Sequence, residues 1–461
     1  MKINTAYKAK IRTPESKNLH AETRSVFYQA ARDTVDVYRR AVDFFINVVN
    51  EHWSDVQKFS QKKERVAYTE TLTVVTKNRP VVPHPFGKSK FHKMPAYLRR
   101  AAISEAIGKV SSYRSNLENW KADKKGKMPT LGKAGYVYPT LYKDNCYKQI
   151  DKYTFWIKLF IRNTWDWVEI KLRKSDMDYM ERHCATRTRQ SPTLRRRGKV
   201  WSLDFPFKEN VKLSDTDISS CTILAVDLGL NNAATCTAIA ADGTILGRHF
   251  LKLPKEQDSL RHALNMIKKA QQNGSRRMPR LWAAAKGIND DIAQKTAAFI
   301  IDCTALYDID VIVFEFLDVN GKKRGSKKQR LHHWKANAVQ CIVTDKAHRK
   351  GMHISRVCAW GTSKYAYDGS GTVTRGIDGN YSICRFRSGK IYNCDLSATY
   401  NIGARYLIRE TLKSLSAKVR SAVEAKVPRL AARSTCTWSD YINLLAELEK
   451  FTSPVSEGEA V

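Results

Sequence analysis

The sequence predicts a multidomain α+β protein, with a helical region near the N-terminus and alternating strands and helices in the second half. A length of 461 residues exceeds one ordinary core, which predicts two to four domains. Hydrophobic residues make up 43% of the chain and aromatic residues 10%, enough to fill packed cores. The spacing of apolar residues changes along the chain, from helical steps of three and four to continuous runs typical of buried strands.

The charge balance indicates a polyanionic partner. Lys and Arg number 80 against 45 Asp and Glu, giving a formal net charge of +35. The alternative is a basic solvated surface, but a folded chain with this charge would strongly repel itself without a polyanion. Nucleic acid is therefore the expected partner. The first residues lack a signal peptide's apolar core, and no apolar run approaches the ~18 residues of a membrane span. We therefore expect no membrane partner and a cytoplasmic protein with reduced cysteines.

The first half of the chain predicts one strand, two long helices and a later set of strands. Residues 1–13 alternate weakly, as in a strand, and apolar residues recur at helical steps from Ala21 and again from about Pro95 to Trp120. Aromatic and β-branched runs within 121–218 predict strands. Between two of them we expect a loop, 187–199, that contacts nucleic acid, the alternative being a solvated hairpin tip. The expected contact residues in this loop are Arg187, Arg189, Arg195, Arg196, Arg197 and Lys199.

The second half predicts strands that end in acids. Residues 223–226 are apolar and run into Asp227, and residues 311–314 run into Glu315 in the same way. An Asp-Gly pair at 242–243 predicts a hairpin, so residues 219–251 read as a three-strand meander. A basic helical tract follows, then the Glu315 strand and a basic loop, a helix over 331–350, a strand over 352–358, a loop-like segment over 361–391, and a helix opened by Asp395. Further expected nucleic-acid contacts in the basic tract and loop are Arg276, Arg277, Arg280, Lys322, Lys323 and Arg324.

This order of three strands, helix, strand, helix, strand and helix is typical of a ribonuclease-H-like fold, in which the three acids converge. Each acid alone could be an ordinary strand end or helix cap. Together they predict a catalytic site in which Asp227, Glu315 and Asp395 hold two magnesium ions, or manganese, because hard carboxylate oxygens suit these ions. In-line cleavage of a phosphodiester uses two such ions about 3.5–4 Å apart.

Residues 225–232 (Ala-Val-Asp-Leu-Gly-Leu-Asn-Asn), 313–317 (Val-Phe-Glu-Phe-Leu) and 394–404 (Cys-Asp-Leu-Ser-Ala-Thr-Tyr-Asn-Ile-Gly-Ala) resemble the three RuvC motifs of transposon-encoded TnpB. The compact type V CRISPR effectors share these motifs. The resemblance implies a magnesium-dependent hydrolase that cleaves DNA under RNA guidance in a single RuvC site. Its implied partners are a guide RNA, transposon-derived or CRISPR, and double-stranded target DNA. The implied assembly is a monomeric ribonucleoprotein, associated with the nucleoid through DNA.

The resemblance also implies an arrangement of lobes. It comprises a wedge strand (1–13), a helical recognition lobe (14–120), a β-barrel wedge domain (121–218), a RuvC-like nuclease domain with motifs I and II (219–357), a zinc-ribbon-like insert that binds target nucleic acid (358–391), RuvC motif III (392–412), and a C-terminal helix and tail (413–461).

The sequence departs from the family in the insert. Relatives usually carry two Cys-x-x-Cys pairs there, whereas only three cysteines, Cys358, Cys384 and Cys394, fall in or beside this segment. Their spacing fits no standard zinc site, so we expect a ribbon without zinc. Packing of three tyrosines, Tyr365, Tyr367 and Tyr381, would hold it. A Cys-Cys-Cys-His site that uses His353 is the alternative.

Two other functions stay open at this stage. One is an RNA-guided DNA-binding regulator that does not cleave, which the presence of all three acids disfavours. The other is an unguided ribonuclease-H-like transposase or nuclease, which the large basic N-terminal region disfavours.

Overall fold

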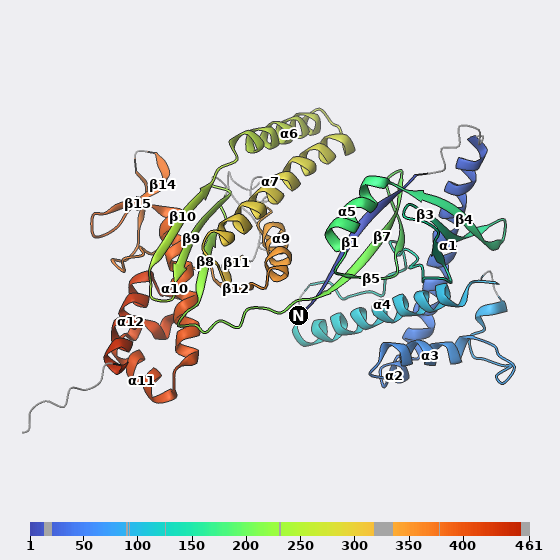
Figure 1. Cartoon of the computed structure of the whole chain (residues 1–461), viewed down its shortest axis with the longest axis horizontal. Coiled ribbons are helices and arrows are strands. Elements are labelled where there is room, and N and C mark those ends of the chain that lie inside the picture. The colour runs from blue at the N-terminus through green and yellow to red at the C-terminus, as the bar shows by residue number, and fades with distance from the viewer. Residues whose placement is uncertain are drawn as a thin grey trace, which may run out of the picture. The chain divides into compact units, whose positions relative to one another are not determined.

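The computed structural model describes residues 1–12, 21–88, 91, 93–124, 126–229, 232–317, 335–377 and 379–452. The chain divides into two compact units, Lys2–Glu209 and Asn210–Val461, with Met1 grouped with the second (Figure 1). Within the described part of the chain, every helix is too short or too polar to cross a membrane.

The first unit contains the predicted long helices and several shorter ones. The long helix α1 packs against α4, which crosses it in Figure 1, and also contacts strand β3. Both long helices were predicted from their apolar spacing, which places one face of each in a shared core. The helices of this unit are α1 (Ala21–Glu51), α2 (Trp53–Val56), α3 (Lys62–Thr73), the 3-10 turn η1 (Phe86–Lys88), α4 (Ala96–Asp123) and α5 (Lys174–Cys184).

A seven-stranded sheet completes the first unit. Its strands are β1 (Lys2–Arg12), β2 (Tyr147–Gln149), β3 (Thr154–Ile161), β4 (Thr164–Leu172), β5 (Thr188–Arg189), β6 (Thr193–Arg197) and β7 (Val200–Asn210). They pair in the order β2-β3-β4-β1-β7-β5, and β6 pairs with β7. In the described residues no backbone ladder joins β2 to β5, but an isolated antiparallel bridge joins Thr140, before β2, to Thr193 of β6. A side-chain hydrogen bond from Arg189 Nη2 to Gln149 Oε1, 2.5 Å long, also links β5 to β2, and the β-barrel stays a prediction.

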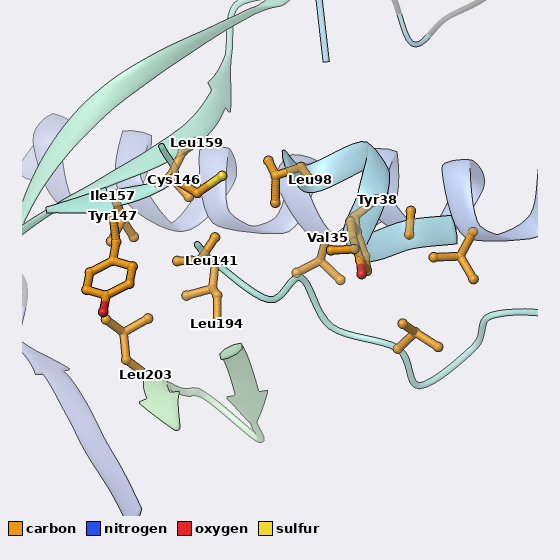
Figure 2. Packing of buried hydrophobic residues seen from close by; sticks show 14 of the residues in the cluster. Val35, Tyr38, Leu98, Leu141, Cys146, Tyr147, Ile157, Leu159, Leu194 and Leu203 are labelled. Atoms are coloured by element: carbon orange, nitrogen blue, oxygen red, sulfur yellow. The ribbon is translucent and has the colours of Figure 1, made fainter. Parts of the chain in front are cut away.

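One hydrophobic core joins these helices and this sheet. Tyr38 of α1, Leu98 of α4 and Ile157 of β3 are almost fully buried in it (Figure 2). Hydrogen bonds support the packing, because the Phe160 amide donates to Thr34 Oγ1 at 2.8 Å, tying β3 to α1. The region carrying α1 and the sheet therefore folds as one body.

The second unit is built on a five-stranded mixed sheet. Its strands are β8 (Thr222–Asp227), β9 (Ala234–Ala240), β10 (Ile245–Leu251), β11 (Val311–Phe316) and β12 (His353–Cys358), in the order β10-β9-β8-β11-β12. Strands β8, β9 and β10 form the predicted antiparallel meander, and β11 is parallel to both β8 and β12. Its helices are α6 (Pro254–Gln272), α7 (Pro279–Ala305), α9 (Ala336–Arg349), α10 (Cys394–Ser414), α11 (Ala417–Lys426), the 3-10 segment η2 (Pro428–Thr435) and α12 (Trp438–Thr452).

Helices cover both faces of this sheet, which explains why β8 and β11 are continuously apolar. Ile223 and Ala225 pack in a core with α10 and α12, whereas Leu224 and Val226 pack in a core with α7 and α9. Helix α10 lies directly on β8 and β9 (Figure 1). A Cβ at Gly403 of α10 would stand 2.5 Å from the Ile239 side chain, so glycine permits the close approach that brings this helix to the sheet.

Three sequence predictions need correction here. The expected loop 187–199 is β5, β6 and a turn at Gly198, because each strand finds β7 as a partner. The loop-like 361–391 segment contains most of a three-stranded sheet of β13 (Thr374–Ile377), β14 (Asn380–Arg385) and β15 (Ile391–Asn393). The expected single C-terminal helix is two helices, α11 and α12, separated by η2; Pro428 begins that break.

Candidate active site

The three predicted acids lie at the ends of three elements that meet on the second unit's sheet. Strand β8 ends at Asp227, and β11 carries Glu315 near its end. The two strands are parallel with Val226 opposite Phe314, so Asp227 and Glu315 follow directly as neighbours across the ladder. Asp395 lies in the first turn of α10, whose N-terminus begins beside the sheet. The fold thus brings together residues that are far apart in the sequence.

The electrostatics of this cluster disfavour bare negative charge. Burial raises the pKa of Asp227 well above its usual range, and the nearby Glu315 and Asp395 carboxylates raise it further. Burial also raises the pKa of Glu315, partly opposed by the Thr362 hydroxyl and the Arg405 guanidinium. Grouped carboxylates of this kind are stabilised by a cation, and strongly perturbed acids mark candidate functional sites.

Two hydrogen bonds orient the acids. Asn232 Nδ2 donates to Asp395 Oδ2 at 2.6 Å, and the side chain of Asn232 is buried. Thr362, also buried, donates a short hydrogen bond from its hydroxyl to Glu315 Oε1. Partners of this kind fix the rotamers of carboxylates that ligate metals. They were not among the predicted site residues.

Helix α10 holds the segment that delivers Thr362. Asn401 Nδ2 donates to the Thr362 and Tyr365 carbonyls, each at 2.9 Å, and Asn401 Oδ1 accepts from the Trp438 amide at 3.1 Å. The buried Arg405 donates to the Cys358 carbonyl at 2.6 Å and the Trp360 carbonyl at 2.9 Å. Helix α10 thus carries Asp395 and also fixes the segment whose Thr362 supports Glu315.

The donor set fits magnesium or manganese. Three carboxylates are hard oxygen ligands, which these ions prefer. Among the described residues, the oxygens of Asp227, Glu315 and Asp395 are not all within 4.8 Å of one another.

One cation near the acids was also missed. Arg375 of β13 favours the ionised form of Asp227, lowering its pKa against the larger raising effects. Its Nη2 donates to the Ser363 carbonyl at 2.7 Å, and the residue is exposed. No sequence pattern singles it out, because it lies in a Gly-rich segment without clear periodicity.

The insert does not assemble the three cysteines. Cys384 and Cys394 are buried, and the Cys384 thiol donates to the Tyr392 carbonyl at 3.5 Å, whereas Cys358 is exposed. His353 Nε2 lies 2.8 Å from the Ser214 carbonyl, and in the described residues no group of these cysteines with His353 has the spacing of a metal site. The alternative four-ligand site is therefore not formed here.

Aromatic packing holds the insert in part as predicted. Tyr367 contacts Phe386 and Tyr392 beside the buried Cys384–Cys394 pair, and Tyr365 lies against Trp360. Tyr381 is 68% exposed and its ring lies over Gly376, outside the buried cluster of Cys384, Phe386 and Cys394.

The predicted nucleic-acid cations of the first unit lie on or beside β5–β7, and several already have carboxylate partners. Arg197 binds Asp204 through two nitrogens, at 2.7 and 3.1 Å, and Arg195 approaches the same carboxylate at 3.6 Å. Arg187 pairs with Glu209 at 2.9 Å. Arg189, Arg196 and Lys199 are exposed.

The predicted cations of the second unit behave differently. Arg276 and Arg277 lie between α6 and α7, not in a helix, and Arg280 lies in the first turn of α7. All three are exposed. Lys322, Lys323 and Arg324 lie outside the described residues.

The structure is similar to a Cas12f1–sgRNA–target DNA complex, with 15% identity, a TM-score of 0.32, and coverage of 87% of this chain and 98% of that one. It is also similar to Alicyclobacillus acidoterrestris C2c1 bound to single-guide RNA, with 11% identity, a TM-score of 0.41, and coverage of 85% and 68%.

The sequence comparisons concern the first unit. Residues 15–161 match the model of the Aq_aa04 family. The uncharacterized protein aq_aa04 of Aquifex aeolicus (strain VF5) is 33% identical over 129 residues, which cover 25% of this chain and 70% of that protein. This chain belongs to the Aq_aa04 family.

Proposed function

We propose that this protein is a metal-dependent DNA endonuclease that works under RNA guidance and cleaves in a single RuvC-type site. The observation that carries the proposal is the convergence of Asp227, Glu315 and Asp395 from β8, β11 and α10, with mutual repulsion that a cation would relieve. A structural role for three such carboxylates without a cation is unfavourable.

The residues divide the work at this site. Asp227, Glu315 and Asp395 would hold two magnesium or manganese ions, which when bound supply a water-derived nucleophile and stabilise the leaving oxygen. Thr362 and Asn232 hold the Glu315 and Asp395 carboxylates in place. Arg375, exposed and electrostatically coupled to Asp227, is placed to attract a phosphate.

Guidance by RNA rests on two further observations. The net charge of +35 favours a polyanionic partner, and the three motifs around the acids resemble those of TnpB and compact type V effectors. Guide RNA and double-stranded target DNA are the partners proposed from this resemblance, with a monomeric ribonucleoprotein in the cytoplasm as the working state. In a guided nuclease the heteroduplex reads sequence, and the protein reads a short flanking motif.

The deciding experiment is to express the protein with its flanking locus and sequence the RNA that copurifies. The particle is then tested for magnesium-dependent cleavage of DNA complementary to the variable end of that RNA. We expect one RNA species with a constant scaffold and cleavage at the matched target. A particle without discrete RNA that still cleaves DNA would favour an unguided nuclease or transposase.

The Asp227→Ala variant isolates the catalytic claim. It removes a metal ligand and no phosphate contact, so cleavage should be abolished while RNA and target binding persist. Binding without cleavage in the wild-type particle, at all magnesium concentrations, would favour a guided regulator. Cleavage by Asp227→Ala at the wild-type rate would remove the acidic triad from the mechanism.

A further inference from the structure

A second cluster of metal-binding side chains lies in the first unit, where the proposed nuclease function uses none of them. Glu51 is the last residue of α1, and His52 follows it before α2. His84 lies in the segment between α3 and α4. Among the described residues, these three form the one group of His, Cys, Asp or Glu whose ligand atoms all lie within 4.8 Å of one another.

The distances between the ligand atoms in this cluster approach those between the ligands of one shared ion. The Nε2 atoms of His52 and His84 are 3.0 Å apart, and Glu51 Oε1 is 3.9 Å from the first and 3.7 Å from the second. Ligand atoms about 2.0–2.1 Å from a tetrahedral ion lie roughly 3.3 Å from each other. The observed values bracket that spacing, so small side-chain rotations would complete the site.

The backbone presents both imidazoles before any ion binds. His84 stands between Pro83 and Pro85, whose rings restrict the chain, and its amide donates to the Leu72 carbonyl at 3.1 Å. The His52 amide donates to the Val48 carbonyl at 3.0 Å, continuing α1. The two histidine side chains are held about one-quarter exposed, at 25% and 24%, whereas Glu51 is 63% exposed and can turn inward.

The hydrogen bonding does not account for all three groups. One neutral imidazole can donate to the other, but Glu51 stands beyond hydrogen-bond distance from both rings. A carboxylate directed at two facing imidazole nitrogens is the donor set of zinc and similar transition metals, not of magnesium.

We propose that Glu51, His52 and His84 bind one divalent transition-metal ion of the zinc type, with water in the remaining position. The ion would fasten the segment between α3 and α4 to the end of α1. Because metal binding of this kind contributes to folding, it would stabilise the first unit independently of the acids on the second.

The test uses the full chain, stripped with a chelator and titrated with cobalt(II) as a visible probe. We expect about one cobalt ion per chain in a four- or five-coordinate nitrogen–oxygen site, with intense visible absorption that zinc(II) abolishes. His52→Gln and His84→Gln should lose this signal. His353→Gln and Asp227→Ala should keep it, since one changes an unrelated histidine and the other the acidic triad.

Two results would overturn the proposal. One is that the wild-type protein shows no cobalt absorption that zinc abolishes. The cluster would then be only a hydrogen bond between two histidines. The other is an undiminished signal in the His84→Gln protein. If the histidine variants do not fold, the exposed Glu51→Gln substitution decides, with an expected loss of zinc affinity of at least about tenfold. Unchanged affinity in Glu51→Gln excludes the three-ligand site.

Discussion

Asp227, one of the three acids of the proposed catalytic site, carries an electrostatic penalty in the metal-free protein. Burial and the neighbouring carboxylates raise its pKa above the ordinary value of 3.8. Between that value and the raised one, the folded protein binds more protons than the unfolded chain. The free energy of unfolding therefore falls as pH rises through this window. Above the window Asp227 is ionised in the folded protein, and the whole destabilisation is present. Asp227 therefore lowers the stability of the metal-free protein, as expected of a residue kept for function.

The first prediction concerns this penalty. Without divalent ions, Asp227→Asn should unfold at a higher temperature than the wild type, and its advantage should be larger at about pH 8 than at about pH 5. Magnesium should narrow the difference by stabilising the wild type. Thermal unfolding across pH, with and without magnesium, measures both effects. Asp217→Asn is the control of opposite sign, because Ser219 hydrogen bonds lower the pKa of Asp217. An advantage that does not change with pH would contradict the assigned cause.

Thr362 supplies the second prediction, because its hydroxyl, which valine lacks, donates to Glu315 Oε1 and is also hydrogen-bonded to the Ala359 carbonyl at 3.0 Å. Thr362→Val should reduce the cleavage rate about 10- to 100-fold, the range seen when an outer partner of a metal ligand is removed. Target binding should not change. Thr304→Val is the matched control, because that threonine is equally buried but bonds only to the Ile301 carbonyl in α7. Equal rates for the two variants would show that Thr362 has no positioning role.

At the scale of elements, α10 organises the site. It carries Asp395 in its first turn, Asn401 and Arg405 further along, and Gly403 on the face that meets the sheet. The helix therefore couples two acids, because a shift of α10 would displace Asp395 and the segment that holds Thr362 together.

The third prediction tests that coupling through Asn401. Asn401→Ala removes three hydrogen bonds, two of them buried and one partly buried, and should lower the stability of the second unit by about 3 kcal/mol. It should also speed hydrogen exchange in residues 359–367 and slow cleavage. Exchange mass spectrometry with a cleavage assay measures both. Asn145→Ala, which loses one local bond on an exposed turn, is the control. If hydrogen exchange in residues 359–367 stays at the wild-type rate, α10 does not hold the segment that positions Glu315.

The same elements show what sequence could and could not predict. Strands β8 and β11 were predictable because both faces are covered, which forces a continuous apolar run that ends at each acid. Strand β6 was hidden by its arginines, which pair with Asp204 across the hairpin and so resemble a solvated loop in sequence. The contacts of Thr362 with Glu315 and Asn401 join residues 47 and 39 positions apart, and no local periodicity of the sequence indicates them.

Over the whole molecule, the excess of positive charge is not equally available to a polyanion. Asp204 accepts ion pairs from Arg195 and Arg197, and Glu209 pairs with Arg187, so these cations contribute to the β5–β7 region's own stability. The exposed Arg276, Arg277 and Arg280, where α6 meets α7, contribute less to the stability of the fold. Counting basic residues in a sequence does not distinguish these two groups, although their expected effects on binding differ.

The last prediction contrasts the two groups. If Arg276, Arg277 and Arg280 each contact a phosphate, changing all three to Gln should weaken nucleic-acid binding and reduce the log–log salt slope by about 2–3. The comparison variant, Arg195→Gln with Arg197→Gln, leaves Asp204 without its ion pairs. It should lower thermal stability and change the salt slope less. Binding titrations at several salt concentrations, with thermal unfolding of each variant, measure both quantities. An unchanged slope in the triple variant would mean that the α6–α7 connection is a solvated surface, and the phosphate contacts would have to lie elsewhere.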